Sequence, residues 1–103
     1  MSATYPYPEV RLRQIASDMA DCDPKDVALP SVCLAVERLW KTRAEAAEKA
    51  ALTAEAFAVN TRDAGLEAPT VALDRSVEEA RTLAATCRDK AAAWHARFLE
   101  LHP

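Results

Sequence analysis

The sequence predicts an all-α protein: a long antiparallel, alanine-rich, coiled-coil-like helical hairpin, with a short N-terminal helix packed at its base to complete a three-helix bundle. The chain of 103 residues has 23 alanines and a single glycine, a composition that favours helix. Apolar side chains recur at helical spacing over two long segments, and helix-breaking residues fall between those segments. We expect one domain over 1–103, with helices at 8–21, 31–64 and 72–101 and a short helical turn at 24–29.

The first predicted helix begins at Pro8, a residue that suits the first turn of a helix. Leu12, Ile15 and Met19 then follow at spacings of three and four. The segment "DCDPKD" ends this helix. Within that segment Asp23 is a candidate N-cap for the short turn that begins at Pro24.

The second predicted helix follows Pro30, where Ser31 can cap its first turn. No breaker occurs before Gly65, the only glycine. Gly65 is placed for a left-handed C-cap, with Leu66 folding back on the last turn. Pro69 prevents this helix from continuing, so the third helix is expected to start after Thr70 or after Asp74 and to end near Leu101.

The third helix carries a heptad seam, meaning a row of apolar residues at alternating spacings of three and four. The seam is Thr70, Leu73, Val77, Ala80, Ala84, Cys87, Ala91, Trp94, Phe98 and Leu101. The second helix offers a matching row: Cys33, Val36, Trp40, Arg43, Ala47, Ala50, Ala54, Phe57, Thr61 and Ala64. A short loop between two such helices predicts an antiparallel hairpin. Arg43 is the odd member of its row, and we expect it at the seam edge with its charge in water.

Small residues face small residues over the half of the hairpin nearest the loop, whereas Trp40 and Trp94 fall at the other end. Alanines let two helices approach closely, but each buries little apolar area. The first helix is too short to cover the whole hairpin. We therefore expect a three-helix base and a weakly held arm of two helices.

A second apolar stripe predicts a protein-interaction surface on this arm. Leu52, Ala56 and Val59 lie off the seam of the second helix at i, i+4 and i+7, and Leu83 lies off the seam of the third. On an arm with no third helix, such a stripe predicts a partner, either another protein or a second copy in a homodimer. The alternative is that the register is wrong by one residue and that the stripe is core.

Two alternatives assign chemistry or DNA binding to the chain. Acidic residues resemble, by spacing alone, the Glu-x-x-Glu pattern of MazG-type nucleotide pyrophosphohydrolases, a resemblance that implies Mg²⁺-dependent hydrolysis: Glu45, Glu48, Glu78, Glu79 and Asp89. Hairpin pairing does not bring these carboxylates together, so a solvated helix face is the preferred interpretation. Residues 13–39 resemble a helix-turn-helix, but Pro30 interrupts the second helix and Asp23 and Asp26 would face DNA.

Composition argues against several other classes of protein function. The net charge of −3 argues against nucleic-acid binding, and no apolar run is long enough to span a membrane. Three cysteines without Cys-x-x-Cys spacing predict reduced thiols in a cytoplasmic protein and no metal site. We expect no catalytic residues and no cofactor. The excess of alanine and arginine suggests a bacterial or phage origin. The sequence thus predicts a small non-enzymatic interaction module that acts as an adaptor, inhibitor or assembly component and associates with itself.

Overall fold

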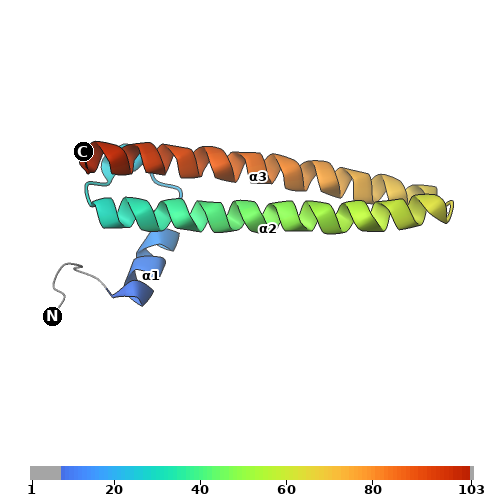
Figure 1. Cartoon of the computed structure of the whole chain (residues 1–103), viewed down its shortest axis with the longest axis horizontal. Helices are drawn as coiled ribbons and strands as arrows, with labels where there is room; N and C mark the ends of the chain where they lie inside the picture. Colours follow the sequence, from blue (N-terminus) through green and yellow to red (C-terminus); the bar gives the residue numbers. More distant parts are fainter. Residues whose placement is uncertain (1–7, 103) are drawn as a thin grey trace. The chain divides into compact units, whose positions relative to one another are not determined.

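The computed structural model describes residues 8–102 and contains, over this range, only helices and the segments that join them. The helices are α1 (Glu9–Met19), the 3₁₀ helix η1 (Pro24–Asp26), α2 (Pro30–Asp63) and α3 (Glu67–Leu101) (Figure 1). The long helices α2 and α3 pack closely and α1 packs at the base of the pair, so the predicted fold class is confirmed. No helix among the described residues has the length and apolar character needed to cross a membrane.

The short turn after α1 is smaller than the predicted range of 24–29. Asp23 caps it as expected, since its side chain accepts a hydrogen bond of 3.0 Å from the backbone N–H of Lys25. The backbone is extended again at Val27, with φ −104° and ψ 127°. Pro30 restricts the residue before it to extended conformations, which explains why helical geometry is not resumed before α2.

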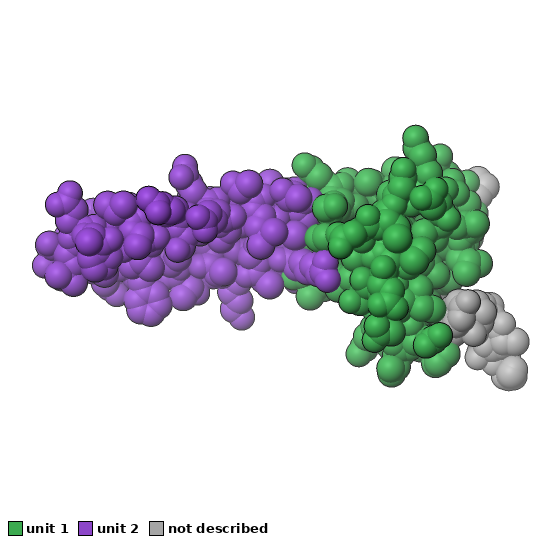
Figure 2. All heavy atoms as spheres, turned by 180° about the vertical axis from the view of Figure 1, so that it is seen from behind, with its two compact units in different colours: residues 1–42, 88–103 green, residues 43–87 purple. Residues whose placement is uncertain are grey.

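The chain divides into two compact units, coloured separately in Figure 2. The base unit consists of the described residues 8–42 and 88–102, and the hairpin unit consists of Arg43–Cys87. The long helices α2 and α3 each contribute residues to both units, whereas α1 and η1 belong to the base unit alone.

The base unit is built around two tryptophans. Trp40 of α2 is 6% exposed and Trp94 of α3 is 2% exposed, which confirms that large side chains gather in this unit. Around them lie smaller buried residues from every element of the unit except η1: Ala16, Ala20, Val27, Val32, Cys33, Val36 and Ala91.

Polar side chains attach α1 and the η1 segment to the long helices. The indole Nε1 of Trp40 donates to the carbonyl oxygen of Ala20, 3.1 Å away, at the C-terminal end of α1. Arg97 of α3 donates from Nε to the carbonyl oxygen of Val27 at 3.0 Å, and its guanidinium also reaches the carbonyl of Lys25. These bonds satisfy carbonyls that no helix pairs.

The turn between α2 and α3 is a Schellman motif, as the glycine predicted. Gly65 has φ 75°, its N–H donates to the carbonyl of Arg62, and the N–H of Leu66 donates to the carbonyl of Thr61. The predicted start of the third helix at residue 72 is wrong, because α3 begins at Glu67. Pro69 falls within the first turn of α3, where a missing N–H costs no intrahelical hydrogen bond.

In the hairpin unit the alanine seam forms, with half of its α2 positions shifted by one residue. On α3 the predicted residues are buried or half-buried throughout, for example Thr70, Val77 and Ala84. On α2 the seam runs through Ala44, Ala51 and Ala58 in place of the predicted Arg43, Ala50 and Phe57, which are exposed. The observed register keeps the Arg43 charge in water and places alanine where two helices approach too closely for phenylalanine.

Candidate functional site: an open groove on the hairpin

The predicted stripe on α2 lies on the surface of the hairpin unit. Leu52 is 65% exposed, Val59 is 49% exposed, and Ala56 between them is exposed as well. The alternative in which this stripe is core is therefore wrong, even though the seam beside it is shifted by one residue. The three residues project from one side of α2 because they are spaced by four and three.

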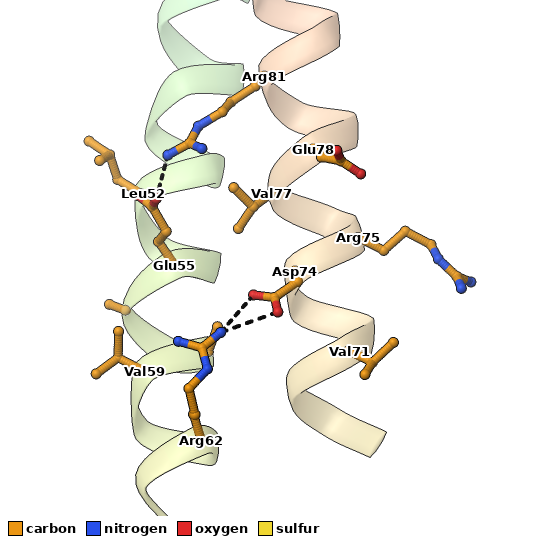
Figure 3. Close-up of a pocket in the computed structure, with 12 residues that line it drawn as sticks. Leu52, Glu55, Val59, Arg62, Val71, Asp74, Arg75, Val77, Glu78 and Arg81 are labelled. Atoms are coloured by element: carbon orange, nitrogen blue, oxygen red, sulfur yellow. Dashed lines mark hydrogen bonds and ion pairs between the residues drawn. The ribbon is translucent and has the colours of Figure 1, made fainter. Parts of the chain in front are cut away.

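The stripe borders an open groove between α2 and α3 (Figure 3). Val77 forms part of its floor, and Val71 of α3 adds a further exposed apolar side chain to its wall. From α2 the lining residues are Leu52, Glu55, Ala56, Ala58, Val59 and Arg62; from α3 they are Val71, Asp74, Arg75, Val77, Glu78 and Arg81.

Two ion pairs cross the groove from one helix to the other. One guanidinium nitrogen of Arg62 lies 3.2 Å from each carboxylate oxygen of Asp74. The Arg81 guanidinium donates to the carboxylate of Glu55, as the dashed lines in Figure 3 mark. All four side chains are about half exposed, so each pair contributes at most about 1 kcal/mol to stability. Both pairs join α2 to α3 across the groove.

Two further charged residues on the α3 wall are free to meet a ligand. Among the residues that the structure describes, Arg75 and Glu78 form no ion pair or hydrogen bond through their side chains. Both are exposed and line the groove. The groove therefore presents an apolar stripe together with one unpaired cation and one unpaired anion.

Leu83 does not belong to this groove, although the sequence groups it with the α2 stripe. It is 55% exposed but is absent from the groove lining. Arg81, two residues earlier, does line the groove, and residues two apart on a helix point about 160° away from each other. The Leu83 side chain therefore projects from the opposite side of the hairpin to Leu52 and Val59.

The base unit has a second, smaller groove, between α1 and α2. Its apolar lining includes Leu12 and Ala16 of α1 with Leu34 and Leu39 of α2, and its lining also includes Glu9, Arg13 and Arg38. This groove is not predictable from the sequence, because it depends on the angle at which α1 meets α2.

A buried carboxylate lies elsewhere in the base unit. Glu37 of α2 is 3% exposed and is held between Lys41, 2.8 Å away, and Nδ1 of His95 of α3, 3.0 Å away. Burial acts to raise the pKa of Glu37, but hydrogen bonds to Lys41 and His95 and their charges outweigh it, so the pKa lies below 4.5. The Glu37–Lys41 spacing of four is visible in the sequence, whereas the contact with His95 requires the fold.

The residues considered for chemistry remain dispersed in the part of the chain that the structure describes. No three His, Cys, Asp or Glu side chains gather there as a metal site would require. Cys22, Cys33 and Cys87 are free, and the last two are buried. No observation on these residues favours the pyrophosphohydrolase or the DNA-binding alternative over a protein-binding role.

Apolar periodicity in the sequence identifies three of the groove residues, Leu52, Ala56 and Val59, but not most of its walls. The missed signal lies in charge spacing: Glu55 and Arg62 are seven residues apart on α2, as are Asp74 and Arg81 on α3. Charges repeating every seven residues beside a heptad seam are typical of interhelical ion pairs. This repeat would have predicted which sides of the two helices face each other.

Comparisons with protein-family models, with curated proteins and with solved structures each found no match to this chain.

Proposed function

We propose that this protein is a non-enzymatic interaction module that binds an amphipathic helix of another protein in the hairpin groove. The observation that carries the proposal is the exposed stripe of Leu52, Ala56 and Val59 along a groove whose walls are charged. A helix laid into a groove buries apolar residues at i, i+3 or i+4, and i+7, which is the spacing that the stripe itself has.

The charges on the groove wall indicate which charged residues a partner helix would carry. Arg75 and Glu78 are three residues apart on α3, close enough for a single helix to meet both. A complementary helix would carry an acidic residue opposite Arg75 and a basic residue about one turn away, opposite Glu78. Glu55 and Arg81 neutralise each other across the groove, so these charges do not repel such a helix.

The proposal is tested with a display library of helical peptides that carry leucine or valine at i, i+4 and i+7 and random residues elsewhere. The full chain should enrich peptides with one acidic and one basic residue a turn apart. Replacing Leu52 and Val59 together with glutamate should abolish their binding. The matched control is Thr53→Glu with Asn60→Glu, which adds the same charge at the same spacing on exposed positions of α2 that do not line the groove.

A charge exchange gives a second, independent measurement. The double variant Arg75→Glu and Glu78→Arg should select peptides in which the acidic and basic positions are interchanged. If no peptide is enriched, or if the enriched peptides bind the Leu52 and Val59 variant as well as the control, the groove is not a helix-binding site.

A further inference from the structure

Two arginines in the hairpin groove are held by carboxylates and are still open to a ligand. Arg62 of α2 pairs with Asp74 of α3. Arg81 of α3 pairs with Glu55 of α2. The two arginine side chains nevertheless remain 56% and 59% exposed. A ligand that enters the groove therefore meets two cations whose guanidinium planes are already restricted in orientation by their ion pairs.

The two ion pairs lie about two helical turns apart along the groove. Seven residues separate Glu55 from Arg62 on α2, and seven separate Asp74 from Arg81 on α3. At a rise of about 1.5 Å per residue, this spacing is about 10.5 Å. Figure 3 shows Val77 at a level between the two pairs.

Between the two ion pairs the groove has an apolar floor. Ala58 of α2 and Val77 of α3 are buried there, at 2% and 6% exposure, while Val59 stands half exposed beside them. Ala56 is exposed but small, so it leaves room above it. We call this part of the groove the window, and it consists of Ala56, Ala58, Val59 and Val77. The window is thus an apolar surface with a cation at each end.

We propose that the window is the anchor site of the groove and that it takes an aromatic side chain of the bound helix. This inference rests on the helix-binding function proposed above and names the residue class that the partner inserts. A ring seated midway between the ion pairs lies about 5 Å from each guanidinium, within the about 6 Å over which a cation attracts an aromatic face. One ring can therefore present a face to each cation while its edge rests on the apolar floor.

An aromatic ring fits the window better than the other side chains that a helix can present. An aliphatic side chain gains the apolar contact but no attraction to the guanidiniums. A basic side chain is repelled by both arginines, and an acidic one has to give up water over an apolar floor. An arginine guanidinium is more weakly hydrated than a lysine ammonium and stacks on aromatic rings, so a ring can cover it at little cost.

The anchor agrees with the charges assigned to the partner helix. Arg75 and Glu78 lie between Asp74 and Arg81 in the sequence and line the same wall of the groove. The acidic and basic residues of the partner would therefore lie beside the inserted ring, and the ring fixes their position along the groove.

The test uses the helical-peptide library described above with the i+4 position randomised as well. The full chain should enrich phenylalanine, tyrosine or tryptophan at this position. The best aromatic peptide and its leucine counterpart are then titrated against the wild type and against Arg62→Gln with Arg81→Gln. The ratio of the two affinities should fall about 10-fold in this variant, because two cation–π contacts of about 3-fold each are lost. Taking the ratio cancels any general effect of the variant on the groove.

Arg75→Gln is the matched control, because it removes a cation from the same groove outside the window. It should weaken both peptides alike and leave the affinity ratio unchanged. Arg62→Lys with Arg81→Lys keeps both charges but not the guanidinium planes, and it should lower the ratio by a smaller factor. Circular dichroism verifies that every variant stays helical.

Two results would overturn the anchor site and leave helix binding standing. One is enrichment of aliphatic residues at i+4, and the other is an affinity ratio that Arg62→Gln with Arg81→Gln does not change. If neither library yields a binding peptide, the helix-binding function fails and the anchor site fails with it.

Discussion

Replacing Trp40 with phenylalanine should detach the C-terminal end of α1 from the base unit. The indole Nε1 of Trp40 is the donor that reaches the carbonyl of Ala20, and Ala20 is the C-cap residue of α1. Phenylalanine keeps most of the apolar contact but leaves this carbonyl without its donor. Trp94→Phe is the matched control, because Trp94 is buried to a similar extent and the same ring is shortened.

The expected magnitude follows from this difference. Both variants lose part of a buried ring, which lowers the free energy of unfolding by similar amounts. Only Trp40→Phe also leaves a buried acceptor unpaired, which costs about 1–3 kcal/mol. Trp40 has a further contact with Lys90, whose Nζ lies 5.0 Å from the ring centroid, and phenylalanine weakens it slightly. Trp40→Phe should therefore be the more destabilising variant by about 1–3 kcal/mol, out of roughly 5–15 kcal/mol for a domain of this size.

The measurement is urea unfolding followed by circular dichroism, together with hydrogen exchange of amides in 9–20. Trp40→Phe should accelerate exchange in α1 specifically, whereas Trp94→Phe should not. Equal destabilisation by the two variants, with α1 amides exchanging alike, would refute the role assigned to the indole hydrogen bond. If Trp40→Phe and Trp94→Phe each lowered the free energy of unfolding by less than about 0.5 kcal/mol, the buried positions of the two rings would be contradicted.

Two further predictions concern a buried charge and the turn of the hairpin. Because the pKa of Glu37 is lower in the folded protein than its ordinary value of 4.5, the stability that Glu37 contributes is present above pH 4.5 and is lost as the pH falls through the folded pKa. Glu37→Gln should therefore destabilise the protein at pH 7 and flatten the acid limb of its stability profile in urea titrations; an unchanged acid limb would contradict this. Gly65→Ala should lower the stability by about 1–2 kcal/mol, because φ is 75° at a position with open space around it, and Gly65→Asn should cost less. Equal thermal midpoints for the wild type and Gly65→Ala would show that the turn can adopt another conformation.

The fold was predictable because its signals are local. Helical spacing, a single glycine and a few prolines determine where the helices lie, and the Schellman turn at Gly65 follows from one residue and its neighbour. The start of α3 was not predictable to a few residues, because proline at residue 69 is compatible both with a break and with a first helical turn. The sequence alone does not distinguish a helix break from a first helical turn. Proline is tolerated in a first turn because its missing N–H would have had no intrahelical acceptor there.

The candidate site was predictable only in part. Periodicity identified Leu52 and Val59 as lying off the seam, and the structure places both on the surface. Periodicity could not show on which side of the hairpin Leu83 lies, because this requires the pairing of α2 with α3. The ion pairs of Arg62 and Arg81 reveal that pairing. Phe57 was wrongly predicted to lie in the seam, because a large apolar residue is expected there unless the two helices are known to approach closely.

The shifted seam connects the internal packing of the hairpin unit with its outer surfaces. Ala44, Ala51 and Ala58 fill the α2 side of the contact with α3, so the larger apolar residues of α2 in this unit have no place inside it. They project on two sides of the hairpin instead, with Val59 on the side of the groove and Phe57 pointing about 160° away from Val59. An alanine seam buries little area by itself, whereas Phe57 and Val59 can each bury an apolar side chain worth about 1.5–3 kcal/mol when covered. Any partner that covers either side therefore adds to the stability of the hairpin unit by linkage, so that its folding and its association reinforce each other.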